Sequence, residues 1–255
     1  MQPAAFSDAV LAWWREHGRD LPWRRTRDPY ALLVAEVMLQ QTQVARVVDR
    51  WTAWLERWPD AGSLASATPA EVLQAWQGMG YNRRALNLHR ASRVVAAGGW
   101  PTTYDGLRTL PGVGPYTAAA LAVQAFGADL LPVDVNVRRV LERALGRTDL
   151  DPPAGRASDF LQALFDLGAT VCLARVPRCD RCPVAAGCPS RGRRYEPARR
   201  QGRFEGSRRQ ARGRLLDRLR EGPVALPDAD AEIVAALVRD GLAVVTNRVV
   251  TLPTG

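Results

Sequence analysis

Lysine is absent from the chain. Its 255 residues include 35 basic side chains, and all of them are arginine. A lysine amine can lose its proton and attack a sugar carbon to form a Schiff base, whereas a guanidinium stays charged and cannot. Genomic base composition is the simplest origin of this usage, but the chemical consequence holds either way: lysine-dependent lyase chemistry is excluded.

Long apolar runs are missing as well. The longest, such as residues 118–126, fall short of a bilayer span, and the first residues show no basic region followed by an apolar stretch. We therefore expect no membrane partner and a cytoplasmic protein. The length suffices for two modest domains, each with a core of its own.

The net charge of +9 resides in one segment. Residues 191–220 hold 12 arginines and 3 acidic residues, whereas the remainder of the chain is neutral. Such a block is either a solvated linker or a surface for an acidic polymer, and it suits a small neutral substrate less well.

Residues 110–115 form a glycine- and proline-rich turn, LPGVGP. Its two glycines permit positive φ and close backbone approach, and Pro115 suits the first turn of a following helix. Exposed amides at a helix N-terminus bind phosphate, although a tight turn between two helices would explain the glycines alone. Asp134 follows about twenty residues later, in the segment PVDVNV.

A second acidic residue stands in an apolar helix. That helix is predicted to open at Asp28-Pro29, with Asp28 as its N-cap, and to continue through residue 39. Glu36 has almost only apolar neighbours, so burial should raise its pKa and favour a proton donor near neutrality. The segment alone is equally compatible with an exposed helix position or a capping acid.

The chain has only four cysteines, and they lie close together. Cys172, Cys179, Cys182 and Cys188 follow the spacing C-x6-C-x2-C-x5-C. Four soft thiolates this close suit a tetrahedral zinc ion or a [4Fe-4S] cluster, and a cytosolic setting argues against disulfides. The spacing by itself leaves zinc as a serious alternative.

In order, type and spacing, these motifs resemble the endonuclease III and MutY superfamily of DNA glycosylases. The segment EVMLQQTQV, residues 36–44, resembles the signature of the MutY adenine glycosylases, and the turn at 110–115 resembles the family's helix-hairpin-helix. The resemblance implies that Glu36 protonates adenine N7 and that Asp134 stabilises the cationic sugar or bonds it transiently, before water completes hydrolysis. Asn136 and Tyr116 would orient the aspartate and the water.

The same resemblance assigns contacts with DNA. One of the two glutamines after Glu36 would enter the gap left by the flipped base, the tyrosine of the loop GMGYNRRA would stack beside the opposite base, and the hairpin would grip the backbone. The residues concerned are Gln40, Gln41, Tyr81, Arg83, Gly112, Val113 and Gly114. Asn82 stands where the family has a second tyrosine, and Val135 stands where it often has glycine.

Two further features of the family bear on chemistry and cofactor. Tyr116 occupies the hairpin position at which bifunctional relatives carry the attacking lysine, so the resemblance implies a monofunctional enzyme. The cysteine spacing is that of the family's [4Fe-4S] cluster, which implies this cofactor rather than zinc. The cluster would then present Arg175 and Arg178 to phosphate and would perform no hydrolysis itself.

The fold implied is all-α. We expect a helix-hairpin-helix DNA glycosylase fold with a six-helix module over residues 28–128 and a [4Fe-4S] cluster module made by residues 1–27 together with 129–190. Residues 191–206 would be an Arg-rich linker. Residues 207–255 are predicted to form two helices and a hairpin, a winged-helix-like unit too short to be the larger domain with which MutY proteins commonly inspect 8-oxoguanine.

The sequence therefore predicts a monomeric, monofunctional glycosylase that removes a flipped-out adenine mispaired with guanine or 8-oxoguanine in double-stranded DNA. Two alternatives remain. Asn82 and Val135 leave open a mismatch glycosylase that removes thymine or uracil opposite guanine. A non-catalytic iron-sulfur DNA-binding protein is the other alternative, and the presence of both Glu36 and Asp134 argues against it.

Overall fold

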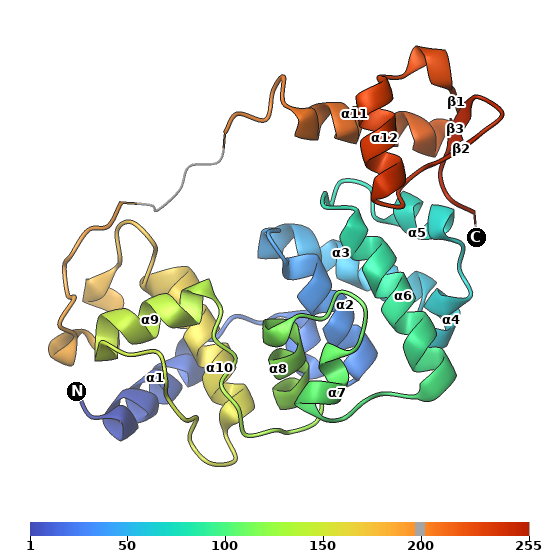
Figure 1. Cartoon of the computed structure of the whole chain (residues 1–255). Coiled ribbons are helices and arrows are strands. Elements are labelled where there is room, and N and C mark those ends of the chain that lie inside the picture. Colours follow the sequence, from blue (N-terminus) through green and yellow to red (C-terminus); the bar gives the residue numbers. More distant parts are fainter. Residues whose placement is uncertain (197–201, 255) are drawn as a thin grey trace. The chain divides into compact units, whose positions relative to one another are not determined.

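The computed structural model of the protein describes residues 1–196 and 202–254 (Figure 1). Helices dominate this part of the chain and a small sheet lies near its C-terminal end, so the helical fold with a winged-helix-like tail is confirmed. The chain divides into two compact units. The first contains Met1–Leu32, Pro101–Thr109 and Val113–Arg200, and the second contains Leu33–Trp100, Leu110–Gly112 and Gln201–Gly255.

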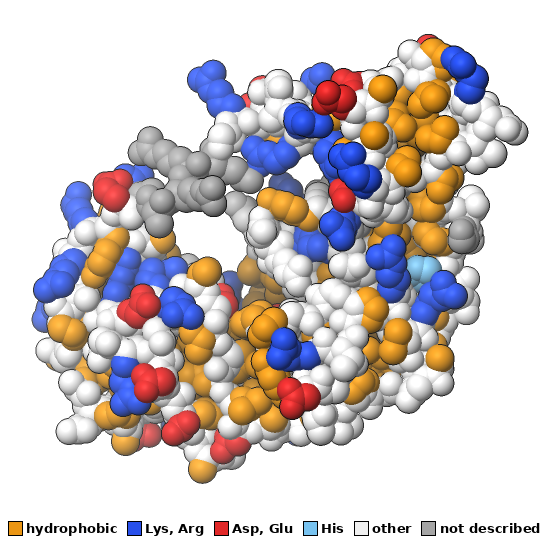
Figure 2. Space-filling model, in the orientation of Figure 1, with side chains coloured by type: hydrophobic (Ala, Val, Ile, Leu, Met, Phe, Trp, Pro, Cys, Tyr) orange, Lys and Arg blue, Asp and Glu red, His pale blue; other side chains and the backbone are white. Residues whose placement is uncertain are grey.

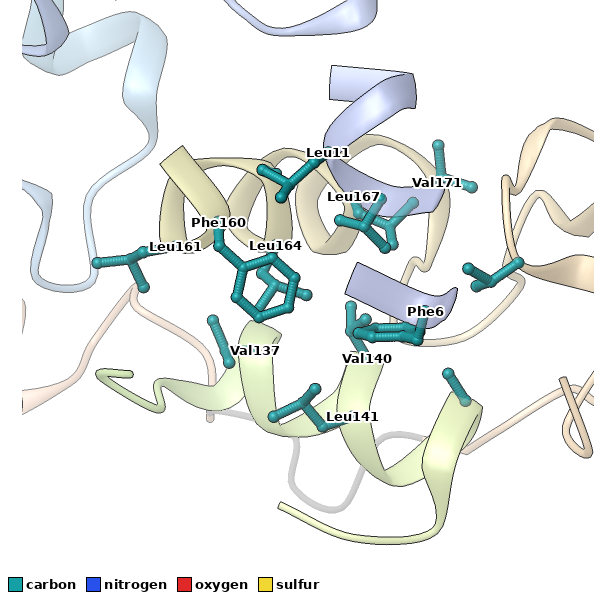
Figure 3. Close-up of a cluster of buried hydrophobic side chains, with 14 of the residues drawn as sticks. Phe6, Leu11, Val137, Val140, Leu141, Phe160, Leu161, Leu164, Leu167 and Val171 are labelled. Carbon is teal, nitrogen blue, oxygen red and sulfur yellow. The ribbon is translucent and has the colours of Figure 1, made fainter. Parts of the chain in front are cut away.

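The core of the first unit is formed by three amphipathic helices, and the unit contains two further helices. Its helices are α1 (Pro3–His17), α7 (Tyr104–Arg108), α8 (Pro115–Gln124), α9 (Val135–Leu145) and α10 (Ala157–Asp166). Figure 3 shows apolar side chains of α1, α9 and α10 pointing toward one another. On α9 the buried positions Val137, Val140, Leu141 and Ala144 recur at helical spacing. Phe6 and Phe160 meet edge to face, with ring centroids 6.3 Å apart.

From the sequence alone, the segment LPWR at residues 21–24 predicts an extended crossing, but the structure has a short helical turn there. Pro22–Arg25 form a 3-10 turn, because proline presets a helical φ at its first position and the Arg24 amide donates to the Leu21 carbonyl at 3.0 Å. After α10, the chain makes a π-turn at Leu167–Val171 and two 3-10 turns at Cys179–Arg181 and Ala185–Gly187. These irregular turns carry the cysteines.

One carboxylate of the first unit is completely buried. Asp166, at the end of α10, accepts two hydrogen bonds from the Arg24 guanidinium at 2.7 and 2.8 Å, further bonds from Arg19, and one from the Trp14 indole at 2.9 Å. Burial by itself would raise the pKa of Asp166, but the hydrogen bonds from Arg24 and Arg19 outweigh it and lower the pKa. These bonds tie the N-terminal residues to α10.

The second unit holds most of α2 and the helices that follow it in the chain. Its helices are α2 (Pro29–Leu39), which starts in the first unit, α3 (Val44–Arg57), α4 (Ala61–Ala65), α5 (Pro69–Ala75) and α6 (Arg83–Gly98). Asp28 caps α2 as predicted, with its carboxylate accepting from the amides of Tyr30 and Ala31. The sequence did not predict α4, which a capping box between Asp60 and Ser63 starts.

The C-terminal part of the second unit resembles a winged helix. It runs α11 (Arg208–Glu221), β1 (Val224–Ala225), α12 (Ala231–Arg239), β2 (Val244–Thr246) and β3 (Val249–Thr251), with a 3-10 turn at Leu226–Asp228. The antiparallel strands lie in the order β1-β3-β2. The sequence predicts the hairpin turn at Thr246-Asn247. In the structure Asn247 and Arg248, both at positive φ, make the turn one residue later, because Thr246 still pairs with Val249.

Several expectations about organisation stay predictions. Helix α8 lies in the first unit here, whereas the sequence grouped residues 115–128 with the six-helix module. The Arg-rich linker expected at 191–206 lies partly outside the described residues, at 197–201. Within residues 1–196 and 202–254, no helix is both long and apolar enough to cross a membrane.

Candidate functional site

Asp134 is the N-cap of α9. Its Oδ1 accepts hydrogen bonds from the backbone amides of Asn136 at 2.8 Å and Val137 at 2.7 Å, and its Oδ2 accepts from the Asn136 side-chain amide at 2.8 Å. A carboxylate with three such donors has a fixed orientation, and the positive end of the helix dipole favours negative charge there. The structural role as a cap and the proposed catalytic role are therefore compatible.

Asn136 connects Asp134 to the segment that carries the cysteines. Its side-chain oxygen accepts from Arg139 Nη2 at 2.9 Å, and the same guanidinium donates to the carbonyls of Gly168 and Cys172, both at 2.7 Å. Burial, only partly offset by the attraction of Cys172, lowers the pKa of Arg139. The sequence pattern gives only one signal for Arg139, its place about one helical turn after Asn136 on the same face of the helix.

The hairpin turn at 110–115 has one glycine that sterics require. Gly112 has a φ of +77°, and a Cβ there would lie 2.6 Å from the Cβ of Asn87. Gly114 caps α8 at a φ of −85°, and Pro115 occupies the first helical position. Val113 is buried, so only its backbone can serve as the DNA contact that was predicted. The turn has the form expected of a phosphate-binding helix start.

Tyr116 lies in the first turn of α8. Its ring is half-buried, and its centroid is 6.4 Å from that of Phe165 on α10. Tyr116, Asp134 and Asn136 all belong to the first unit, whereas Glu36 belongs to the second.

Glu36 is a half-buried residue in the middle of α2. The residues before and after it, Ala35, Val37 and Met38, are buried, and their exposed fractions are between 1% and 5%. The helix thus presents a carboxyl group from an otherwise apolar segment. This matches the surroundings predicted for a proton donor.

A buried arginine joins the two loops that were assigned to DNA. Arg84 donates to the carbonyls of Val37 at 2.8 Å and Met38 at 3.1 Å, which are the last carbonyls of α2, and also to that of Gln40. It also donates to the carbonyls of Met79 at 2.9 Å and Gly80 at 3.1 Å. Burial lowers the pKa of Arg84 to about 10, so the group is still charged at neutral pH. The sequence placed Arg84 in the loop motif but gave it no role.

Two of the residues assigned to DNA share an unusual backbone conformation. Gln41 has a φ of +57° and Tyr81 a φ of +46°, and both side chains are exposed. Apart from Asn247 and Arg248 in the hairpin turn, they are the only non-glycine residues at positive φ in the described chain. This conformation costs about 1–3 kcal/mol and persists where surrounding contacts enforce it. Both turns thus expose a side chain at a tip that Arg84 helps to fix.

The four cysteines line a single pocket with Arg143 and Arg178. Arg143 Nη1 lies 3.6 Å from Cys172 Sγ, and the Gly192 amide donates to Cys179 Sγ at 3.3 Å. Burial, together with the neighbouring sulfurs, raises the pKa of Cys182 to about 11. In the described ranges, no three cysteine, histidine or acidic side chains are arranged to hold a single metal ion. The donor set itself, four thiols with amide and guanidinium groups beside them, fits an iron-sulfur cluster.

The arginines predicted to bind DNA differ in their surroundings. Arg175 and Arg178, in the cysteine segment, are exposed, and Arg178 donates to the Thr170 carbonyl at 3.4 Å. Arg83 is also exposed but forms an ion pair of 3.5 Å with Asp240 at the end of α12. Gln40 is half-buried, with its carbonyl bound to Arg84. The outward placement of the cysteine-segment arginines suits contact with phosphate.

Several known proteins are similar to this chain in sequence and in fold. The model of the HhH-GPD superfamily base excision DNA repair proteins matches residues 34–163. The adenine DNA glycosylase of Mycolicibacterium smegmatis is 45% identical over 249 residues, which cover 88% of this chain and 84% of that protein. A thermostable thymine-DNA glycosylase superposes with a TM-score of 0.68 at 30% identity, over 73% of this chain and 95% of the other. A trapped endonuclease III–DNA covalent intermediate gives 0.62 at 26% identity, over 72% and 92%.

Proposed function

The chain belongs to the HhH-GPD superfamily of base excision DNA repair proteins, and on this basis we propose that it is a monofunctional adenine DNA glycosylase acting on adenine mispaired with guanine or 8-oxoguanine. The observation that carries the proposal is the 45% identity to an adenine DNA glycosylase over 88% of the chain. The family assignment confirms the resemblance inferred from the motifs. A duplex DNA substrate fits the cytoplasmic, nucleoid-associated location expected from the sequence, which stays a prediction.

Asp134 would act on the sugar. Hydrolysis of an N-glycosidic bond develops positive charge at the anomeric carbon, and a carboxylate fixed at that position stabilises it. The three hydrogen bonds from Asn136 and Val137 hold the carboxylate without reorganisation during the reaction. Asn136, held in turn by Arg139, would orient Asp134 rather than touch the base.

Glu36 would act on the base. Adenine is a poor leaving group as an anion, so a proton delivered to N7 lets it depart neutral. A half-buried carboxyl on the apolar helix α2 is a suitable group to donate that proton. Glu36 and Asp134 would then have the two roles found in two-carboxylate sugar hydrolases, Glu36 as the proton donor and Asp134 as the carboxylate that stabilises the sugar cation.

Strand cleavage through a Schiff base would require an amine at the sugar. Tyr116 occupies the hairpin position at which bifunctional relatives have the attacking lysine, and this chain contains no lysine at any position. Borohydride trapping on abasic-site DNA should therefore give no covalent complex when the N-terminal amine is blocked. A trapped complex under that condition would show that the enzyme is not monofunctional.

DNA would be held by backbone and side chains together. The Gly112–Gly114 turn would bind phosphate through its amides, and Arg175 and Arg178 would add charge, a combination that fixes position without reading sequence. Gln41 and Tyr81, exposed at positive φ, would fill the stack around the flipped nucleotide, with Gln40 and Arg83 beside them. This arrangement supports the proposal of a double-stranded mismatch substrate, and we expect the protein to act as a monomer.

The cofactor proposed is a [4Fe-4S] cluster. Cys172, Cys179, Cys182 and Cys188 would hold it in the pocket that they line. Bound there, it would brace the loop that carries Arg175 and Arg178. The chemistry at the sugar needs only the two carboxylates and water.

One observation favours a second candidate. The similarity to a thymine-DNA glycosylase, together with Val135 after the catalytic aspartate and Asn82 in the loop, is compatible with removal of thymine or uracil opposite guanine. A non-catalytic DNA-binding protein is disfavoured, because its ligand would need neither Glu36 nor Asp134. The two enzymatic candidates differ in substrate alone.

A panel of duplexes separates them. Duplexes bearing adenine, thymine or uracil opposite guanine or 8-oxoguanine are incubated with the protein, and alkali then converts abasic sites to strand breaks visible on a gel. Breaks at adenine, and none at thymine or uracil, support the proposal. Breaks confined to thymine or uracil would assign the second candidate instead.

A further inference from the structure

In the C-terminal unit, residues 207–255, one arginine contacts Asn82 of the loop GMGYNRRA. Arg220, in the last turn of α11, donates from Nε to the Leu73 carbonyl of α5 at 3.1 Å and from Nη2 to Asn82 Oδ1 at 3.0 Å. Its Nη1 pairs with Asp217 at 2.6 Å. The three guanidinium nitrogens are thus all used, two of them on residues outside the C-terminal unit.

Arg220 is placed for these contacts rather than for solvent. Its side chain is 8% exposed, whereas the partner carboxylate Asp217 is 54% exposed. Burial, only partly offset by Asp217, lowers the pKa of Arg220. Removing a guanidinium from water costs free energy unless its N–H donors find other acceptors. The hydrogen bonds to Leu73 and Asn82 therefore offset the desolvation of Arg220.

Other contacts hold the C-terminal unit on the same surface. Asp240, just after α12, pairs both with Arg212 of its own unit and with Arg83 at the start of α6. A Cβ on the neighbouring Gly241 would lie 3.4 Å from Arg90 Nη2, which shows how closely the chain approaches α6. Figure 1 shows α11 and α12 beside α5, and Figure 2 shows arginine side chains gathered over the same region.

The helix α12 has little to offer DNA directly. Its buried face packs within the C-terminal unit, and its exposed positions are Ala231, Glu232, Ala235, Val238 and Arg239. A helix that reads bases or phosphates needs donors and positive charge along that face. This one has a single arginine and an acidic residue.

The residue that Arg220 holds lies next to the strained tip of the loop. Tyr81 is 49% exposed at a φ of +46°, and Asn82 follows it directly. On its inner side the turn is fixed by Arg84 and by the Trp76 indole, which donates to the Gly80 carbonyl at 3.0 Å. Arg220 supplies the support on the other side, where Asn82 replaces the tyrosine of the related motif.

We propose that Arg220 is a positioning residue through which the C-terminal unit sets the conformation of the turn Gly78–Asn82, and thereby the response of the enzyme to the base opposite the target adenine. The part concerning DNA rests on the proposed function. The part concerning the turn rests only on the contacts of Arg220. In this proposal the C-terminal unit supports the turn Gly78–Asn82 through Arg220 and does not itself contact the opposite base.

The test compares Arg220→Met with Arg218→Met. Both replace an arginine of α11 by an unbranched apolar side chain, but Arg218 donates only to the Asp228 carbonyl within the C-terminal unit. Amide hydrogen exchange is followed over residues 77–85 in the DNA-free protein. Arg220→Met should speed exchange at the Met79, Arg84 and Ala85 amides about tenfold, a change that corresponds to the free energy of one hydrogen bond to a charged group. Arg218→Met should leave the exchange rates unchanged.

The DNA arm measures affinity and single-turnover excision on A·G and A·8-oxoguanine duplexes. Arg220→Met should change the ratio of the single-turnover excision rates on the two duplexes several-fold, and Asn82→Ala should do the same. The double variant should be no worse than either single one, because both remove the same contact. Arg220→Lys keeps one donor nitrogen and should therefore return part of the way to the parental behaviour. It also replaces Arg220→Met in the test if that variant fails to fold.

Three outcomes would overturn the proposal: unchanged exchange over 77–85 in Arg220→Met, equal effects of Arg218→Met, or a lowered melting temperature with the parental duplex ratio. If the parent removes no adenine from any duplex while Arg220→Met still speeds exchange and alters duplex affinity, the adenine assignment fails and the positioning role stands.

Discussion

Arg139 supports Asp134 indirectly, by holding the side chain of Asn136. It bonds Asn136, Gly168 and Cys172 at once, so its loss would free the asparagine that orients the aspartate. We predict that Arg139→Met slows single-turnover adenine excision by up to about 100-fold while duplex affinity changes little, because misplacement acts on the transition state.

The neighbouring Arg138→Met is the matched control. Arg138 is exposed and pairs with Glu142 at 4.0 Å on the outer face of the same helix, so its loss should leave the rate unchanged. Equal rates for the parent and Arg139→Met would show that Asn136 needs no such support.

Asp166 makes the stability of the first unit depend on pH. Its pKa is lowered in the folded protein, so its contribution is present above the ordinary aspartate pKa of about 3.9 and is lost as pH falls through the lower folded value. At pH 7, Asp166→Asn should destabilise the protein by about 3–5 kcal/mol, because two buried or half-buried arginines lose their counter-charge.

Denaturant unfolding of the parent and Asp166→Asn between pH 7 and 3 checks this. The difference in free energy should shrink toward the acid end of the range. A difference that stays constant with pH would mean that packing, and not charge, explains the effect.

Individual residues were predicted unevenly from the sequence. Acids and cysteines could be found because chemistry fixes their type and spacing, as for Asp134 and Glu36. Arg84, Arg139 and Arg220 could not, since an arginine that binds distant carbonyls has the same local pattern as one in solvent. Their roles depend on contacts between residues 29 to 147 positions apart.

At the scale of elements, the hairpin turn gives a paired prediction. Gly112→Ala should lower both stability and DNA affinity, because a Cβ would meet Asn87 at 2.6 Å at a φ of +77°, a conformation that costs a side chain about 1–3 kcal/mol. Gly114→Ala, at a φ of −85°, should lower DNA affinity alone, since the added methyl would cover the amides without strain.

Thermal unfolding and duplex titration of both variants distinguish the two glycines. If Gly114→Ala binds duplex as tightly as the parent, phosphate does not approach this turn and the backbone grip lies elsewhere.

Helices were easier to predict than the elements around them. The strong amphipathic pattern placed α9 at Val135–Leu145, with the bounds that the structure has. The strand β1, with two residues, is too short for any period to appear, and it forms only because β3 offers a partner. The 3-10 turn at Pro22–Arg25 was read as extended because four residues with a proline fit either form.

For the whole molecule, the helical glycosylase fold was predictable because several motifs agreed in order and spacing. Its division into units was predictable only at residue 200, inside the Arg-rich segment. The chain also passes between the units at residues 32, 100, 109 and 112, where no linker composition marks the change.

The cluster gives a prediction for the whole molecule. The purified protein should be brown and contain about four irons per chain, and loss of iron should lower its thermal stability, because four cysteines of one pocket would lose their common partner. Elemental analysis and melting curves of anaerobically prepared protein measure both. Stoichiometric zinc without iron would contradict the cluster.

The central claim is that two carboxylates perform base excision while other residues bind DNA. Single-turnover excision and duplex titration on one A·G substrate test it most directly, with the parent, Glu36→Gln and Asp134→Asn. Excision should fall by about 100-fold or more in each variant, whereas duplex affinity and its salt dependence should stay near those of the parent. Adenine excision by Glu36→Gln at the parental rate, with thymine or uracil opposite guanine as the better substrate, would contradict the account.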